Sequence, residues 1–291
     1  MKPAHLALLV VLNLFWAATL SVYKVLEPCL APGGIVTVRF ALAGLCLLAL
    51  WPVLPGQAPR GWDLVKTLVM GLLLFVLGQR LQVLGNQLGT AGNSSVLMAL
   101  EPVLASVGAA AFLREHIGPR RLTGFALGML GVALLNGVWR EDFELTGLVA
   151  SLIFISSFLC EAAYSIMGKP IISRAGFMKV LTLSLVAGTL ANILIDGPET
   201  FTAARAMPLE AWLWLGYLAL ICTVVGYGAW FMVIREVEVN VAALTIFIQP
   251  VAGVAVAALW LGESLHWGQL WGGLTIVTGL AFGLSRQVKR E

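Results

Sequence analysis

NSSVLMALEPVLASVGAAAFLREHIGPRRLTGFALGMLGVALL, residues 93–135, has a counterpart in VAALTIFIQPVAGVAVAALWLGESLHWGQLWGGLTIVTGLAFG, residues 241–283. Each stretch contains two apolar runs that are joined by a short connection with charged residues. Several positions coincide when the two are aligned: Glu101-Pro102 on Gln249-Pro250, Glu115 on Glu263, Gly124 on Gly272 and Gly131 on Gly279. A repeat of this length indicates that a unit of several helices is duplicated.

The repeat extends toward the start of both halves. Ala17-Ala18 and Lys24 match Ala162-Ala163 and Lys169, and Gly78 matches Gly226. The chain is therefore predicted to consist of two five-helix units, residues 1–140 and 141–291. Because five is odd, the second unit enters the membrane from the opposite side, which gives an inverted repeat.

Apolar runs of about 20 residues, the length of a helix that spans a bilayer, recur along the whole chain. Of its 291 residues 59% are hydrophobic and 11% are charged, whereas soluble domains carry about 25% charged residues. Helices satisfy their own backbone hydrogen bonds in lipid, so an all-α membrane protein with ten transmembrane helices is expected. The expected spans are 5–26, 32–52, 64–86, 91–113, 119–138, 145–168, 176–196, 211–234, 240–261 and 267–285.

Basic residues are distributed unevenly between the two sides of this topology. With the N-terminus in the cytoplasm, the opposite side holds only Lys24, Arg140 and Arg205. Arg39 and Arg80 lie within spans, and the cytoplasmic loops and termini hold the other basic residues: Lys2, Arg60, Lys66, Arg114, Arg120, Arg121, Lys169, Arg174, Lys179, Arg235, Arg286, Lys289 and Arg290. The positive-inside rule therefore predicts that both termini are cytoplasmic.

The composition argues against several classes of function. A net charge of +3 with scattered basic residues gives no support for nucleic-acid binding. No phosphate-binding loop is present, so the chain itself is not expected to use ATP or another cofactor. The three histidines, His5, His116 and His266, are too dispersed for a metal site.

Within this frame, the order of motifs resembles the drug/metabolite transporter superfamily, in particular its EamA-type members. The motifs are Asn93-Ser94-Ser95, Leu100-Glu101-Pro102, Leu113-Arg114-Glu115 and the glycines 124, 128 and 131, with a second copy at Val241-Ala242-Ala243, Gln249-Pro250 and Leu261-Gly262-Glu263. Overall, the chain is most similar to YddG-type exporters of aromatic amino acids. The resemblance implies a bacterial inner-membrane transporter, whereas Gln249 departs from Glu101 and argues against a mechanism with two symmetric acids.

Ionisable residues inside the spans are the first candidates for a site, because a charge at mid-bilayer costs about 3 kcal/mol or more. They are Arg39, Arg80, Glu101 and Glu161, and the structural alternative for each arginine is an ion pair that fixes helix packing. For a zwitterionic substrate, Arg80 and Glu161 are the charged options and Gln79, Gln82 and Gln249 the neutral ones. Pro102 and Pro250 predict matched kinks at the centre.

Aromatic rings gather in the same helices and suit stacking on aromatic substrates or organic cations. Tyr164 lies one helical turn from Glu161, which places both on one side of a helix. The full set of predicted substrate-binding residues is Trp16, Gln79, Arg80, Gln82, Ser94, Met98, Glu101, Glu161, Tyr164, Tyr227, Trp230, Phe247 and Gln249.

The residues and the resemblance together predict a secondary transporter that exports amino acids, aromatic ones included, by alternating access. Two alternatives stay open. One is efflux of lipophilic or quaternary cations, attracted by Glu101 or Glu161. The other is an intramembrane enzyme, although no nucleophile–base pair is recognisable. Gly124-x-x-x-Gly128 and Gly268-x-x-x-Gly272 predict close packing of helices 5 and 10, and a monomer or weak homodimer is expected.

Overall fold

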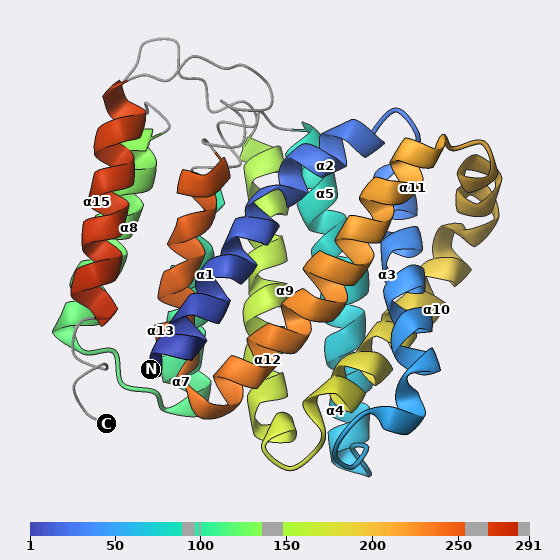
Figure 1. Cartoon of the computed structure of the whole chain (residues 1–291), viewed down its shortest axis with the longest axis horizontal. Coiled ribbons are helices and arrows are strands. Elements are labelled where there is room, and N and C mark those ends of the chain that lie inside the picture. The colour runs from blue at the N-terminus through green and yellow to red at the C-terminus, as the bar shows by residue number, and fades with distance from the viewer. Residues whose placement is uncertain (89–96, 99, 136–147, 254–266, 285–291) are drawn as a thin grey trace.

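A computed structural model describes residues 1–88, 97–98, 100–135, 148–253 and 267–284. All regular structure in these residues is helical, in rods that lie roughly side by side (Figure 1). The first-half elements are α1 (Pro3–Ala17), α2 (Thr19–Leu26), α3 (Pro32–Ala49), η1 (Trp51–Val53), α4 (Trp62–Leu72), η2 (Leu73–Gly78), α5 (Gln79–Leu88), α7 (Leu100–Leu113) and α8 (Pro119–Leu135).

The second half continues the same pattern of rods. Its elements are α9 (Leu148–Ile172), α10 (Phe177–Arg205), α11 (Leu209–Gly216), η3 (Tyr217–Val225), α12 (Gly226–Glu236), α13 (Val239–Leu244), η4 (Thr245–Phe247) and α15 (Trp267–Leu284), with helix continuing from η4 to Gly253. Described helix is present in each of the ten expected spans, so the all-α membrane fold is confirmed.

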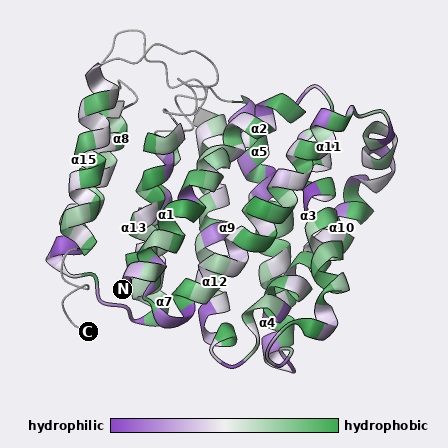
Figure 2. Cartoon of the chain, viewed as in Figure 1, coloured by the Kyte–Doolittle hydropathy of each residue, from purple (hydrophilic) through white to green (hydrophobic). Residues whose placement is uncertain are grey.

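Six helices in the described ranges are long and apolar enough to cross a membrane. Leu100–Leu113, Val239–Gly253 and Leu270–Leu284 are shorter apolar helices. Figure 2 shows hydrophobic residues along the rods and hydrophilic residues in the turns at the lower edge. This distribution suits a bundle whose sides are solvated by lipid.

One boundary differs from its prediction. The expected connection from Asp196 to Glu210 is largely helical, because α10 runs on to Arg205 across a kink at Asp196 (φ −142°, ψ 17°). Pro198 follows the kink, and its fixed φ suits the first turn of the new helical segment. At the kink, the Asp196 carboxylate points toward Arg80. Asp196 Oδ2 lies 2.8 Å from Arg80 Nη2.

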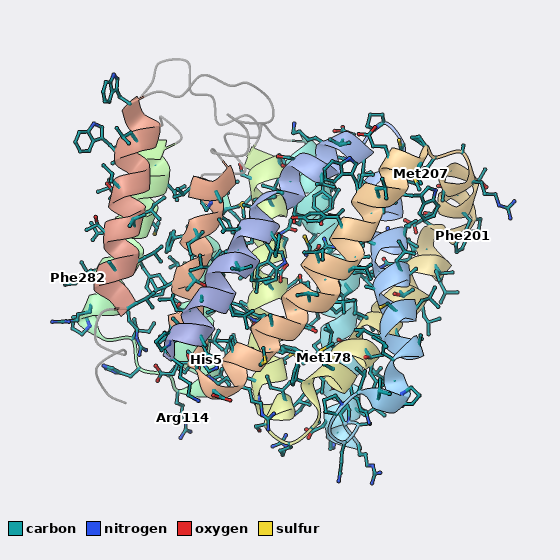
Figure 3. The ribbon with its side chains drawn as sticks, viewed as in Figure 1. His5, Arg114, Met178, Phe201, Met207 and Phe282 are labelled. Atoms are coloured by element: carbon teal, nitrogen blue, oxygen red, sulfur yellow. The ribbon has the colours of Figure 1, made fainter. Side chains whose placement is uncertain are left out.

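Ion pairs gather at the end of the bundle where α1 begins and α15 ends. They join residues that the charge pattern assigns to one side: Lys2–Glu236, Arg121–Glu238, Lys169–Glu115 and Arg174–Asp63. Figure 3 shows Arg114 at this lower edge, pointing away from the rods, with His5 nearby. The predicted cytoplasmic segments thus lie at one end of the molecule.

The predicted close packing of helices 5 and 10 is found between α8 and α15. A Cβ added to Gly124 would lie 3.1 Å from the Gly279 carbonyl oxygen and 3.2 Å from the Gly283 Cα, so no larger residue fits without a shift. Gly131 meets Gly272 and Ile276 in the same way. Small residues let the two backbones approach closely. In lipid the hydrophobic effect does not drive helices together, and such close packing contributes to their association instead.

Candidate functional site

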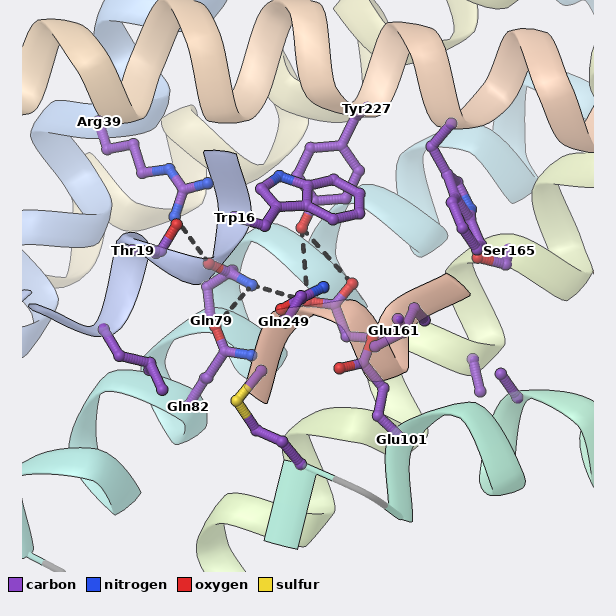
Figure 4. Close-up of a pocket in the computed structure, with 16 residues that line it drawn as sticks. Trp16, Thr19, Arg39, Gln79, Gln82, Glu101, Glu161, Ser165, Tyr227 and Gln249 are labelled. Atoms are coloured by element: carbon purple, nitrogen blue, oxygen red, sulfur yellow. Dashed lines mark hydrogen bonds between the residues drawn. The ribbon is translucent and has the colours of Figure 1, made fainter. Parts of the chain in front are cut away.

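A cavity lies between the two sets of helices, with about 760 Å³ of space that atoms do not fill, its open mouth included. Figure 4 shows side chains from many elements pointing into it. Its lining is contributed by both halves: Trp16, Thr19, Leu20, Arg39, Gln79, Gln82, Met98, Glu101, Ala105, Glu161, Ala162, Ser165, Tyr227, Trp230, Ile246 and Gln249. Polar, charged and aromatic groups therefore meet in one space.

The Gln79 amide links the two buried charges of opposite sign. Its Oε1 accepts a hydrogen bond from Arg39 Nη1 at 3.2 Å, and its Nε2 donates to Glu161 Oε1 at 2.8 Å. Arg39 and Gln79 are 3% and 2% exposed. Since an amide offers one acceptor and two donors, only one orientation of Gln79 satisfies both neighbours. Arg39 and Glu161 are thus connected through an amide.

Arg39 donates further hydrogen bonds to two hydroxyl groups. Its Nε donates to Thr223 Oγ1 at 2.8 Å, and its Nη1 also meets the Tyr23 hydroxyl. Tyr23 in turn donates to Gln79 Oε1 at 3.2 Å. These contacts join α2, α3, α5 and η3, so the guanidinium is held in place before any substrate arrives.

Three aromatic residues line the cavity together with Glu161. The Tyr227 hydroxyl donates to both Glu161 oxygens at 3.4 Å. The Trp16 ring lies 5.7 Å from that of Tyr227 and 6.2 Å from that of Trp230, between centroids. Trp230 Nε1 donates to Ser165 Oγ at 3.0 Å. The indole and phenol groups have hydrogen-bond partners, and their faces make an apolar wall.

Gln249 is fixed by the first helix. Its Nε2 donates to Asn13 Oδ1 at 2.8 Å, and Asn13 Nδ2 donates to Thr245 Oγ1 at 3.0 Å. Pro250 lacks the N–H that would bond to the Ile246 carbonyl, and the helix tightens into the 3₁₀ turn η4 just before it. The 3₁₀ turn η4, which contains the cavity residue Ile246, therefore lies beside the cavity.

A π-helical segment precedes the cavity residues in both halves. The segment η2 ends at Gly78, directly before Gln79, and η3 ends directly before Gly226 and Tyr227. Gly78 and Gly226 are the pair that the repeat aligns. Carbonyls of these segments accept side-chain donors: Asn192 Nδ2 to Phe75 O at 2.8 Å, and Trp16 Nε1 to Cys222 O at 2.8 Å. Such wide turns recur at functional sites.

Most of the residues predicted from the sequence share this cavity. Those on its wall are Trp16, Gln79, Gln82, Met98, Glu101, Glu161, Tyr227, Trp230 and Gln249. Ser94 lies outside the described residues. Pro102 lies in the first turn of α7 beside Glu101, and its carbonyl accepts from Ser106 Oγ at 2.7 Å.

Arg80 lies away from this wall, in a second polar cluster. Its Nη2 pairs with Asp196 Oδ2 at 2.8 Å, and its Nε donates to Asn192 Oδ1 at 2.7 Å. Thr37 Oγ1 donates to Asp196 Oδ1 at 2.8 Å. Neighbouring helix positions point about 100° apart, so Gln79 and Arg80 face different partners. The cluster ties α3 and α5 to α10.

Tyr164 and Phe247 also lie outside the lining. The Tyr164 ring stacks on Phe231 with centroids 5.0 Å apart, and its hydroxyl meets Ser184 Oγ at 3.2 Å. Phe247 packs its ring against Gly128 and lies 6.4 Å from Phe125, between centroids. Both rings therefore belong to helix packing. The side chain of α9 that reaches the cavity one turn after Glu161 is Ser165.

Comparison with known proteins agrees with this architecture. The model of the EamA-like transporter family matches residues 4–137 and again residues 148–284. The chain belongs to the EamA-like transporter family. Its two matches together cover nearly the whole chain, and each falls on one of the two sets of helices.

Relatives of this EamA protein carry names that concern efflux. A probable amino-acid metabolite efflux pump of Escherichia coli (strain K12) is 29% identical, over 97% of this chain and 96% of the relative. A probable terminal-alkyne amino-acid exporter of Streptantibioticus cattleyicolor is 24% identical, over 85% and 82%. A crystal structure of another protein matches with a TM-score of 0.77 at 16% identity, covering 99% of this chain and 100% of that one, and shows the shared fold.

The EamA cavity also contains residues that the sequence does not place there. Arg39 is visible in the sequence as an intramembrane charge, but its connection to Glu161 through Gln79 has no signal there. Thr19 and Ser165 follow Trp16 and Glu161 by three and four positions, and this helical spacing could have identified them. Leu20, Ala105, Ala162 and Ile246 are apolar and resemble any other residue of a span.

Replacing Arg80 by leucine tests whether this arginine serves packing or binding in the EamA protein. Its pair with Asp196 is mostly buried, at 23% and 17% side-chain exposure. We expect a loss of about 1–3 kcal/mol of stability, with substrate affinity of the folded protein unchanged. Thermal unfolding and a binding assay measure the two effects. Weaker binding at unchanged stability would contradict the packing role.

Proposed function

We propose that the protein exports amino acids, aromatic ones included, from the cytoplasm across the bacterial inner membrane. Residues 1–140 and 141–291 act as two inverted halves that rock around the central cavity, with both termini cytoplasmic. One observation carries the proposal: the cavity between the halves holds a fixed guanidinium, two carboxylates and three aromatic rings. A zwitterion with an apolar side chain is complemented by acidic groups, hydrogen-bond donors and aromatic faces.

Further observations support the proposal. The two π-helical segments occupy positions that the repeat aligns, so both halves have a wide helical turn next to the cavity. Pro102 and Pro250 also occupy matching positions. Transporters with inverted repeats bind substrate at the interface between the repeats. The names of the two relatives concern amino-acid metabolites and amino acids.

Counterflow in proteoliposomes tests the proposal. Vesicles with purified protein are loaded with unlabelled phenylalanine, tryptophan or leucine and diluted into trace labelled substrate. We expect transient accumulation of label, at least several-fold above protein-free vesicles. A Trp16→Ala variant, which loses one cavity ring, is expected to slow aromatic substrates more than leucine. Absence of counterflow for every amino acid would contradict amino-acid transport.

A second candidate is efflux of lipophilic cations, and the observation that favours it is the proximity of two acids to three rings. Cations bind well over aromatic faces. The two candidates differ in the need for a substrate carboxylate. Cells that express the protein would gain resistance to quaternary ammonium dyes in one case and to toxic amino-acid analogues in the other.

A further inference from the structure

Two acids face the cavity, and their surroundings differ. The Glu161 carboxylate accepts hydrogen bonds from Gln79 Nε2 at 2.8 Å and from the Tyr227 hydroxyl at 3.4 Å. Glu101, on the neighbouring helix α7, has no hydrogen bond to any residue drawn in Figure 4. Within the described ranges no basic side chain forms an ion pair with it, although it lies on the cavity wall.

Arg39 is the basic side chain on the described cavity wall, and it is connected to Glu161. Arg39 reaches Gln79 Oε1, and Gln79 passes the interaction on to Glu161. Arg39 also donates to Thr223 and to the Tyr23 hydroxyl. Glu161 is thus held between the Gln79 amide, which Arg39 orients, and the Tyr227 hydroxyl, whereas a charged Glu101 is left for a partner from outside the protein. A buried carboxylate without a partner is costly, and a bound ammonium group would remove that cost.

We propose that Glu101 binds the ammonium group of the substrate, and that Glu161 is a positioning residue that stays bound to Gln79 and Tyr227. The inference deepens the proposed function and rests on it. Gln82 lies on the same wall and its Oε1 accepts from Gln79 Nε2 at 3.4 Å, which leaves the Gln82 amide nitrogen for the substrate carboxylate. The substrate side chain then lies against Trp16, Tyr227 and Trp230.

The assignment makes the amine the essential group of the substrate. A primary amine such as phenethylamine keeps the contact with Glu101 and loses only the amide contact. Phenylpropanoate has the ring and the carboxylate but no ammonium, and it would place a second negative charge beside Glu101. We therefore expect phenylalanine to bind most tightly, phenethylamine next, and phenylpropanoate at least 10-fold more weakly than phenylalanine.

The test measures binding of these three compounds to purified wild-type protein and to Glu101→Gln in detergent. A charge-assisted hydrogen bond corresponds to about 10- to 100-fold in affinity, so Glu101→Gln is expected to weaken phenylalanine and phenethylamine by that factor. The same substitution should leave phenylpropanoate unchanged or strengthen it. Glu101→Asp, which keeps the charge, should preserve the preference for amines. Exposed Glu27→Gln serves as the matched control.

The outcomes separate this inference from the proposed function. If wild-type protein shows no counterflow with any amino acid, the proposed function fails. If counterflow is normal and Glu101→Gln binds amines as tightly as wild type, only the assignment of Glu101 is overturned. If Glu161→Gln loses the preference for amines and Glu101→Gln keeps it, Glu161 and not Glu101 binds the ammonium group, and the assignment is overturned. Size-exclusion chromatography checks that each variant is folded. If Glu101→Gln does not fold, the amine preference of Glu101→Asp tests the assignment of Glu101 instead.

Discussion

Arg39→Met is expected to destabilise the protein strongly, and adding Glu161→Gln is expected to restore stability without restoring transport. Arg39 is 3% exposed and interacts with Glu161 through the Gln79 amide. Removing only the cation leaves the Glu161 carboxylate in the bundle without a compensating charge. Removing one partner of a direct buried pair costs about 3–5 kcal/mol. Because the Gln79 amide separates these two charges, we expect a loss of about 2–3 kcal/mol and a fall in Tm of about 5–10 °C.

The double variant separates charge balance from binding. With Glu161→Gln, the buried site is neutral, and an amide at position 161 accepts the Gln79 N–H as the carboxylate did. Apparent Tm values of wild type, both single variants and the double variant form a cycle that measures the coupling. Exposed Arg205→Met is the control and should behave as wild type. Additive single effects would show that Gln79 does not connect the two charges.

Glu115→Ala is expected to loosen the end of the bundle where the ion pairs gather. The Glu115 side chain is 6% exposed, and its carboxylate accepts four hydrogen bonds from three residues. Lys169 Nζ donates at 2.7 Å, the backbone N–H groups of Val239 and Asn240 at 2.9 and 3.0 Å, and Asn240 Nδ2 at 2.9 Å. The carboxylate thus caps the start of α13 and ties it to α7 and α9.

The cost of Glu115→Ala combines a lost cap, about 1 kcal/mol, with a lost partner for Lys169. Together they should lower stability by about 3 kcal/mol or more. Glu236→Ala is a matched control at the same end, because its pair with Lys2 is 56% and 53% exposed and exposed pairs contribute little. Thermal unfolding of both purified variants measures the difference, and equal Tm values would contradict the role of Glu115.

The same substitution should change access to the cavity. In the proposed topology these contacts join α7, α9 and α13 at the cytoplasmic end of the bundle, and we expect them to limit access to the cavity from that side. A cysteine at Ala162, on the cavity wall, should react several-fold faster with an impermeant maleimide from the cytoplasmic face when Glu115 is alanine. The four native cysteines are first replaced. An unchanged rate would show that these contacts stabilise helices without controlling the mouth.

The sequence is most informative where one residue type is rare in its surroundings. Glu101 and Glu161 are charges inside apolar runs, and the high cost of such charges in a bilayer is enough to indicate a site. The sequence is least informative about which face of a helix a residue occupies. Gln79 and Arg80 are neighbours, yet one lies on the cavity wall and the other pairs with Asp196. Tyr164 and Ser165 differ in the same way.

The sequence by itself determined the helical spans and the related motifs of the two halves. The physical reason is that a bilayer demands about 20 apolar residues for each span. Tertiary structure alone decided which side chains meet. The wide turns of η2 and η3 change the rotation of the residues that follow, and the kink at Asp196 supplies the partner of Arg80. Such pairings depend on how the helices are rotated and packed against one another, which the local sequence of each helix does not specify.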